Sequence, residues 1–311
     1  MRAFVTGASG FVGPWLCRHL EACGDEVLAA SHDLDVTDAD GITEALVASR
    51  PDAVYHLAAQ SSVGSSWDDV TGTFQVNLFG TLHILDAANV CTPRPRVLLV
   101  SSAEVYGEVT ASDLPVSETA PFQPATPYAA SKAAAELAGL QAFLGLGLEV
   151  VRARPFNHTG PGQGPAFVVP ALAGQIVDAA LTGATVLQAG NLSARRDFTD
   201  VRDVVAAYRL LIERGVAGDV YNVCSGHSVL LLDVVKRLLA LSGGDLDVEV
   251  APDRVRPVDV PEMRGDPRRL HQATGWQPTI DLDQTLADVL AYWRQEAITG
   301  ERSGPGSSAA W

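Results

Sequence analysis

The stretch Thr6-Gly7-Ala8-Ser9-Gly10-Phe11-Val12-Gly13 follows a short apolar run and opens a segment with the pattern of a helix. Its glycines are spaced G-x-x-G-x-x-G. A dinucleotide pyrophosphate needs this arrangement: Gly7 allows a tight turn, Gly10 lets backbone N–H groups approach the phosphates, and Gly13 lets helix and strand pack closely. The position between a strand and a helix separates this stretch from chance glycine triplets. It predicts a nucleotide-binding strand–turn–helix unit.

Apolar runs of strand length alternate with Ala- and Leu-rich helical stretches in the first half of the chain. The runs are Ala3–Val5, Val27–Ala30, Ala53–Leu57, Val97–Ser101 and Leu148–Arg152, and the helical stretches include 11–23, 73–89 and 127–143. Strands that alternate with helices form parallel sheets. We therefore expect an α/β fold with a doubly wound parallel sheet.

The texture of the sequence changes after residue 155, where glycine and proline become dense. Long irregular connections are expected around residues 185–200 and 250–268, and such loops usually carry binding function. The expected organisation is a nucleotide-binding domain over 1–155, to which a segment of about 197–223 returns, a smaller and mainly substrate-binding lobe over 156–299, and a flexible tail over 300–311.

Composition and charge exclude several classes of function. The 311 residues include 37 acidic and 22 basic side chains, which leaves a formal charge of −15. Attraction to a phosphate backbone cannot drive binding by such a chain, so no nucleic-acid partner is expected. No apolar run has the length that crosses a bilayer, so no membrane contact is expected either.

The cysteines predict reduced thiols and no metal site. Cys17, Cys23, Cys91 and Cys224 form no C-x-x-C pair and have no histidines at ligand spacing. The chain also begins without the basic and then apolar segment of a signal peptide. The expected location is the cytoplasm.

Ser102 and the segment Tyr128-Ala129-Ala130-Ser131-Lys132 are the candidate catalytic groups. A tyrosine and a lysine four residues apart lie on one face of a helix, so the ammonium can lower the pKa of the phenol and reach the nicotinamide ribose. Ser102 would then hold the reacting oxygen against the phenol while a hydride passes to or from the cofactor.

The end of the second strand does not decide between NADH and NADPH. Ser31 and His32 could bind a 2′-phosphate, whereas Asp33 would favour the free ribose of NAD. Asp35 and Val36 could flank the adenine. A solvated turn explains all of these residues equally well.

With these motifs the sequence resembles the extended short-chain dehydrogenase/reductase family that modifies nucleotide sugars. The further motifs that carry the resemblance are His56-Leu57-Ala58-Ala59-Gln60, Asn77 with Gly80-Thr81, Ser101-Ser102-Ala103-Glu104-Val105-Tyr106-Gly107, and Gly275-Trp276-Gln277-Pro278. The resemblance implies a Rossmann domain with a small substrate lobe, and a homodimer formed through the helices at 73–89 and 127–143. The cofactor contacts that it implies are Gly7, Gly10, Phe11, Val12, Gly13, Ser31, His32, Asp35, Val36, Leu57, Ala58, Ala59, Asn77, Tyr128, Lys132 and Pro155.

One longer run points to a branch of that family. Arg154-Pro155-Phe156-Asn157-His158-Thr159-Gly160-Pro161-Gly162-Gln163 is similar to the reductases of GDP-4-keto-6-deoxymannose. Arg195-Arg196-Asp197-Phe198 and Arg256-Pro257-Val258-Asp259 resemble GDP-hexose-binding segments. A diphosphate that enters an acidic protein requires local arginines. The expected contacts of the GDP-sugar are Asn157, Arg196, Arg256 and Asp259.

Three activities remain open at this stage. A reductase would use NADH or NADPH to convert GDP-4-keto-6-deoxy-D-mannose to GDP-D-rhamnose. GDP-mannose 4,6-dehydratases carry a glutamate at the place of Glu104, but similar glutamates occur in the reductases, so Glu104 does not decide. The segment Val27–Asp38 is too short for the long basic loop of those dehydratases, which favours the reductase. A nucleotide-sugar 4-epimerase would need only Ser102, Tyr128, Lys132 and a roomy site.

Overall fold

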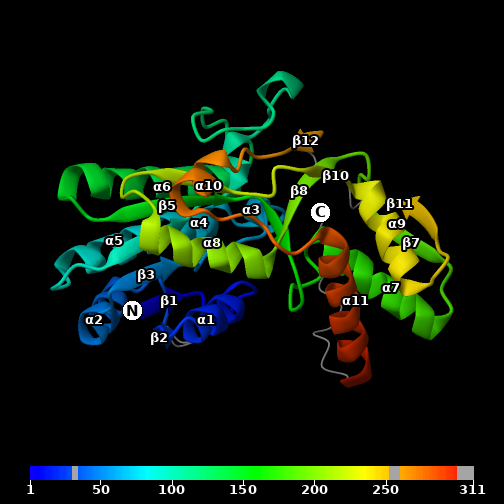
Figure 1. The fold of residues 1–311 in the computed structure, drawn as a ribbon, viewed down its shortest axis with the longest axis horizontal. Helices are drawn as coiled ribbons and strands as arrows, with labels where there is room; N and C mark the ends of the chain where they lie inside the picture. The colour runs from blue at the N-terminus through cyan, green and yellow to red at the C-terminus, as the bar shows by residue number, and fades with distance from the viewer. Residues whose placement is uncertain (30–33, 252–259, 300–311) are drawn as a thin grey trace.

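A six-stranded parallel sheet forms the centre of the larger part of the molecule, and the second half of the chain contributes its last strand. The computed structural model describes residues 1–29, 34–251 and 260–299. The strands lie in the order β2-β1-β3-β4-β5-β9 (Figure 1). Their bounds are β1 Arg2–Thr6, β2 Glu26–Ala29, β3 Ala53–His56, β4 Arg96–Val100, β5 Val150–Pro155 and β9 Val220–Val223. All five pairings are parallel, so the predicted fold class is confirmed.

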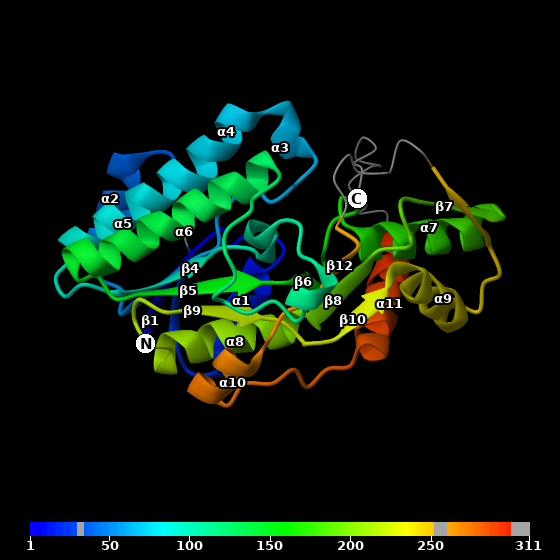
Figure 2. The same ribbon diagram turned by 90° about the horizontal axis from the view of Figure 1, so that it is seen from above.

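Helices cover both faces of this sheet (Figure 2). One face carries α2 (Ala39–Ser49), α5 (Gly80–Val90) and α6 (Pro127–Leu146), and the other carries α1 (Gly13–Ala22), α8 (Val201–Arg214) and α10 (Arg268–Thr274). Strands β3 and β5 are buried along their whole length, as expected of strands that are covered from both sides. Because all strands run parallel, their carboxyl ends lie at one edge of the sheet, where a doubly wound fold binds its ligands.

Helix α6 shows how local sequence sets the start and the end of an element. The Thr126 hydroxyl accepts a hydrogen bond from the amide of Ala129, and Pro127 occupies the first helical position. Gly147 ends the helix with a φ of 66°, a left-handed conformation that glycine adopts without strain. These signals fix the register in which α6 presents Tyr128 and Lys132.

The helix predicted at 73–89 is interrupted. The chain forms α3 (Ser65–Asp68), α4 (Val70–Phe74), a π-helical turn η1 (Gln75–Phe79) and only then α5. Asn77 lies in the π turn and is 1% exposed. Its side chain bonds to the backbone of Gln60 and to the hydroxyl of Ser131, which explains why a buried polar residue can interrupt an apolar helix here.

The C-terminal lobe packs α7 (Val168–Thr182), α9 (Leu231–Ser242) and α11 (Leu282–Thr299) around its own apolar core. A parallel pair of β7 (Val186–Ala189) with β11 (Asp247–Val250) lies at its outer side (Figures 1 and 2). A small sheet of β10 (Ser228–Leu230), β8 (Arg195–Asp200) and β12 (Glu262–Met263) lies between the lobe and the central sheet, and β6 (Asn157–Thr159) also pairs with β8.

The prediction of an irregular connection around 185–200 is wrong, because β7 and β8 occupy most of this segment. Strand β8 carries charged and polar side chains, so it lacks the apolar alternation that identifies a strand, and it forms by pairing with β6, β10 and β12. In 250–268, β12 follows the residues 252–259, which lie outside the described part of the chain. Within the described ranges, no helix is both long and apolar enough to cross a membrane.

Candidate active site

A cavity of about 320 Å³ lies at the carboxyl ends of the central strands and extends to the C-terminal lobe. Its volume is in the range of small-molecule sites. It brings together these residues expected from the sequence: Gly7, Gly10, Phe11, Val12, Gly13, Leu57, Ala58, Ala59, Ser102, Glu104, Tyr128, Lys132, Pro155, Asn157 and Arg196. The predicted catalytic groups and most of the predicted cofactor-binding groups thus share one cavity with two of the predicted sugar contacts.

The glycine turn has the shape that a pyrophosphate requires. Gly7 has a φ of 67°, and a Cβ on it would meet the backbone of Ala58 at 2.8 Å. A Cβ on Gly13 would lie 2.4 Å from the carbonyl oxygen of Gly7. Only glycine fits these two positions. The first turn of α1 has neither a side-chain cap nor an acidic residue, so its N–H groups and its positive dipole end suit an anion. The residues present therefore fit a dinucleotide.

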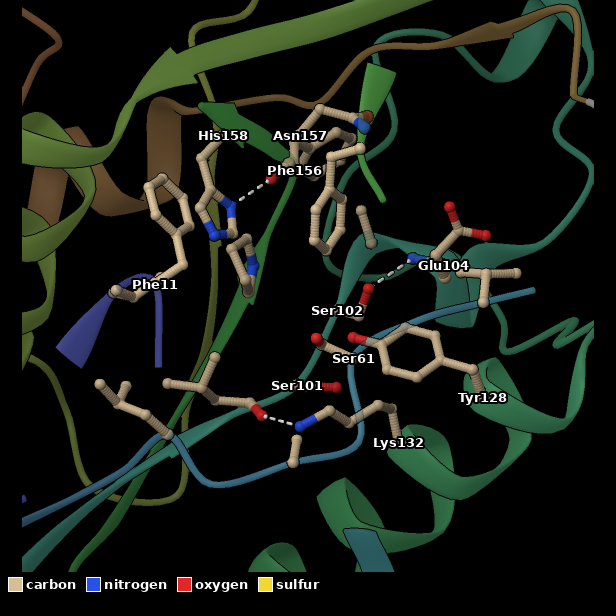
Figure 3. A pocket seen from close by; sticks show the side chains of 18 of the residues that line it. Phe11, Ser61, Ser101, Ser102, Glu104, Tyr128, Lys132, Phe156, Asn157 and His158 are labelled. Carbon is tan, nitrogen blue, oxygen red and sulfur yellow. Dashed lines mark hydrogen bonds between the residues drawn. The ribbon is translucent and has the colours of Figure 1, made fainter. Parts of the chain in front are cut away.

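Ser102 and Tyr128 point toward each other across the cavity (Figure 3). Ser102 follows β4 and caps the 3₁₀ turn η2 (Ala103–Tyr106), in which its hydroxyl accepts a hydrogen bond of 3.2 Å from the amide of Glu104. Tyr128 lies in the first turn of α6, and its amide donates to the hydroxyl of Ser66. Burial raises the pKa of Tyr128 to about 12, although a hydrogen bond with Ser102 lowers it. The phenol is protonated at neutral pH.

Lys132 lies one helical turn after Tyr128 and is 6% exposed. Its Nζ donates to the carbonyl oxygen of Val100 at 2.9 Å (Figure 3). Burial lowers the pKa of this ammonium to about 8. Removal of the phenol from water has the largest effect on the pKa of Tyr128, and it raises that pKa. That Lys132 lowers the pKa of the phenol stays a prediction.

Glu104 lies in the cavity wall next to Ser102 and also lines a smaller adjoining cavity of about 60 Å³. Its negative charge raises the pKa of Tyr128, after the effects of burial and Ser102. Glu104 therefore helps to keep the phenol protonated. A carboxylate in this place could also accept a proton from a bound sugar.

The opposite wall comes from β6 and β8. Asn157, His158 and Arg196 line both cavities. The Nδ1 of His158 lies 3.0 Å from the carbonyl oxygen of Phe156, and its ring stacks on Phe11 with centroids 6.1 Å apart. Arg196 donates to the carbonyl oxygen of Val260 at 2.6 Å, which holds the guanidinium at the edge of the cavity.

Three described residues expected at the cofactor do not line the cavity. Val36 is 6% exposed and belongs to the apolar core that α2 and α5 share, and Asp35 accepts a hydrogen bond from the amide of Thr37. The amide of Asn77 bonds to Gln60 and Ser131, so it supports the cavity wall from behind. Ser31, His32, Arg256 and Asp259 lie outside the described residues.

Several lining residues were not predicted as site residues. They are Ser61, Val63, Thr126, Gln163 and Phe167. Thr126 is visible in the sequence as a helix cap before a proline, but that pattern does not indicate a ligand. Gln163 ends the run Arg154–Gln163 that resembles the reductases, so that run could have indicated it. Ser61, Val63 and Phe167 enter the wall through contacts between distant segments, for which a single sequence gives no local signal.

Comparisons with known proteins agree with this geometry. A model of the family described as GDP-mannose 4,6 dehydratase matches residues 29–289. GDP-6-deoxy-D-mannose reductase of Pseudomonas aeruginosa is 40% identical over 295 residues, which cover 94% of this chain and 97% of that protein. UDP-glucose 4-epimerase of Mycolicibacterium smegmatis is 32% identical over 96% of this chain and the whole of that protein.

Solved structures show the same relationship. The structure of RMD from Pseudomonas aeruginosa complexed with NADPH matches with a TM-score of 0.88 and 39% identity, over 95% of this chain and 99% of that one. A UDP-glucose 4-epimerase from Thermus thermophilus in complex with NAD matches with a TM-score of 0.85 and 30% identity, over 94% of this chain and 99% of that one. The chain belongs to the GDP-mannose 4,6 dehydratase family, within the extended short-chain dehydrogenases/reductases.

Proposed function

We propose that this protein uses NADPH or NADH to reduce the C4 keto group of GDP-4-keto-6-deoxy-D-mannose, which gives GDP-D-rhamnose. The observation that carries the proposal is the buried pair of Ser102 and Tyr128, in which the phenol is protonated at neutral pH. A reduction needs a proton donor beside the carbonyl oxygen. The 40% identity to GDP-6-deoxy-D-mannose reductase, over nearly the whole of both chains, supports the choice of substrate.

Different residues of the chain bind the cofactor, orient the substrate and transfer the proton. The glycine turn and the N-terminus of α1 would hold the pyrophosphate, and Lys132, which lines the same cavity, would bind the nicotinamide ribose. The cofactor supplies a hydride when bound. Ser102 orients the C4 carbonyl by donating to its oxygen, and Tyr128 transfers its proton to that oxygen as negative charge develops. The depth of the cavity keeps bulk water away from both hydroxyl groups.

Arg196 and Asn157 are proposed to bind the sugar nucleotide. A GDP-sugar brings a diphosphate into a protein whose formal charge is −15, so a cation in the wall is needed. The side chain of Arg196 is partly buried, which strengthens a charge-assisted hydrogen bond relative to one in water. Arg256 and Asp259, outside the described residues, remain proposed contacts of the same ligand.

We also propose a cytoplasmic homodimer. All four cysteines are free thiols, which supports a reducing compartment. Large apolar side chains are exposed along the outer face of η1 and α6, with Phe79 at 43%, Leu137 at 51% and Leu144 at 73%. Leu137 and Leu144 are seven residues apart and thus share a helix face. Light scattering on the wild type and on Leu137→Glu tests this surface, and a monomeric wild type would rule it out.

The decisive experiment follows NAD(P)H consumption. Purified protein is mixed with NADH or NADPH and with GDP-4-keto-6-deoxy-D-mannose generated in place from GDP-mannose, and the loss of reduced cofactor is read by absorbance. One cofactor oxidised per sugar is the expected result, and comparison of the two cofactors gives the preference. A dehydratase or a 4-epimerase shows no net consumption. Conversion of GDP-mannose alone to a keto sugar would replace the proposal with the dehydratase.

A further inference from the structure

A buried charged cluster lies directly behind the catalytic residues. Glu136 follows Lys132 by four residues and Tyr128 by eight, so all three side chains project from one face of α6. Glu136 is 0% exposed. It is absent from the lining of the cavity as the described residues define it, so it has no direct role in binding a ligand there.

Arg154 on β5 is the main partner of Glu136. Its Nε donates to Oε2 at 2.9 Å and its second terminal nitrogen donates to Oε1 at 2.7 Å. Arg152 adds a further bond to Oε1 at 3.3 Å. This two-pronged geometry fixes the orientation of the two side chains as well as their distance.

The remaining terminal nitrogen of Arg154 donates to the hydroxyl of Tyr106 at 2.9 Å, and that hydroxyl donates to Oδ1 of Asn222 on β9 at 2.6 Å. The guanidinium also lies over the rings of Tyr106 and Phe122, at 4.9 and 4.7 Å from their centroids. Tyr106 is 1% exposed and ends η2, the turn that Ser102 begins. Arg154 therefore joins the helix of Tyr128 and Lys132 to the turn of Ser102.

The energetics favour a positioning role over a purely stabilising one. Removal of two charges from water costs about as much as their pairing returns, so a buried ion pair is weak evidence for stability. A two-pronged contact with Glu136 on one side of the guanidinium and a bond to Tyr106 on the other do restrict geometry. Proton transfer between positioned groups is sensitive to displacements of about 1 Å, which can cost on the order of 100-fold in rate.

We propose that Arg154 and Tyr106 are positioning residues that set the separation of Tyr128 and Ser102, with Glu136 as the link to α6. This inference rests on the proposed reductase chemistry at Tyr128. It assigns a role to side chains that touch neither the substrate nor the cofactor.

Tyr106→Phe is the direct test, because it removes one hydroxyl from the cluster and keeps the ring. Tyr221→Phe is the matched control: Tyr221 is also 1% exposed, and its hydroxyl bonds to the amide of Val216 and to Asp219, away from the cavity. We expect Tyr106→Phe to lower kcat about tenfold with KM and the Kd of NADPH unchanged. We expect Tyr221→Phe to keep the kcat of the wild type at a similar loss of melting temperature.

Arg154→Lys is the second variant. It keeps a positive charge beside Glu136 but loses the two-pronged contact and the bond to Tyr106, so we expect a lower kcat than for Tyr106→Phe. Equal kcat values for Tyr106→Phe, Tyr221→Phe and the wild type would overturn the inference.

Crystal structures of the two tyrosine variants give a readout that does not depend on the sugar. The separation between the hydroxyl oxygens of Ser102 and Tyr128 is expected to change in Tyr106→Phe and to stay unchanged in Tyr221→Phe. An unchanged separation in both variants rejects the positioning role, whatever the substrate is. Absence of NAD(P)H oxidation by the wild type rejects the proposed function instead, so the two failures are distinguishable.

Discussion

The two ends of the cavity are built in different ways. One end, formed by the glycine turn and α6, is the proposed place of the cofactor and is called the cofactor end. Buried polar groups pair there at the sheet: His56 lies between the hydroxyls of Thr6 and Thr81, and Lys132 bonds to Val100. The other end, formed by β6 and β8, is the proposed place of the sugar and is called the sugar end. Partly exposed side chains such as Arg196 project there from short strands that pair across long sequence distances. The first end can hold reacting groups within a fraction of an ångström, whereas the second can vary with the substrate.

The comparison predicts that chemistry depends most on the cofactor end. Tyr128→Phe should lower kcat by about 100-fold or more, because the proton donor is lost, while the Kd of NADPH stays unchanged. Steady-state kinetics and a fluorescence titration with NADPH measure the two quantities. Tyr55→Phe is the control, since Tyr55 is fully buried and its hydroxyl has no hydrogen-bond partner among the described residues. A Tyr128→Phe enzyme with near-normal turnover would remove the phenol from the mechanism.

At the cofactor end, the buried ammonium of Lys132 should lower the stability of the fold while it supports activity. Lys132→Met removes a buried ammonium, so we expect kcat/KM to fall at least about tenfold while the melting temperature rises by a few degrees. The folded-state pKa of about 8 lies below the ordinary 10.5, so the unfolded chain binds more protons between these values. The free energy of unfolding of the wild type should therefore rise with pH across that window.

Thermal unfolding of the wild type and of Lys132→Met at pH 7 checks the first expectation. A lower melting temperature in the variant would mean that the bond to Val100 outweighs the cost of burying the charge.

Arg196 tests the sugar end. Arg196→Gln should raise KM for the GDP-sugar about tenfold, since a charge-assisted hydrogen bond contributes on the order of 1.5 to 3 kcal/mol, and should leave the Kd of NADPH unchanged. Arg195→Gln is the matched control, because Arg195 is exposed and bonds to Ser228 instead of lining the cavity. Equal KM values for both variants would place the diphosphate elsewhere.

A further prediction concerns acid stability instead of catalysis. Burial lowers the pKa of His56 to about 3, whereas the unfolded chain protonates near 6.5. The unfolded state binds the extra proton between these values, so the free energy of unfolding should fall as the pH falls below 6.5. Urea unfolding at several pH values measures the slope. His56→Asn should flatten it, and an unchanged slope in that variant would assign the acid sensitivity to other groups.

The same contrast explains what could be predicted from the sequence. The glycine turn, the Ser102 strand end and the Tyr128–Lys132 helix are local motifs, so their residue types and spacing predict the parallel sheet and bring these groups to one cavity edge. Strand β8 is polar and forms only by pairing with distant segments, so its sequence alone predicts a loop. The pKa of Tyr128 depends on burial, which no spacing of residues reveals.

The π turn at Gln75–Phe79 has a consequence for how this chain tolerates insertions and deletions. A π turn holds one more residue than an α turn, so the side chains after it are rotated relative to a regular helix. Loss of one residue from 75–79 would restore a regular helix, which is locally more favourable, but would swing the amide of Asn77 away from Gln60 and Ser131. A deletion that improves the helix would thus release the loop at the cavity wall, and length variants in this segment should be rare among active sequences.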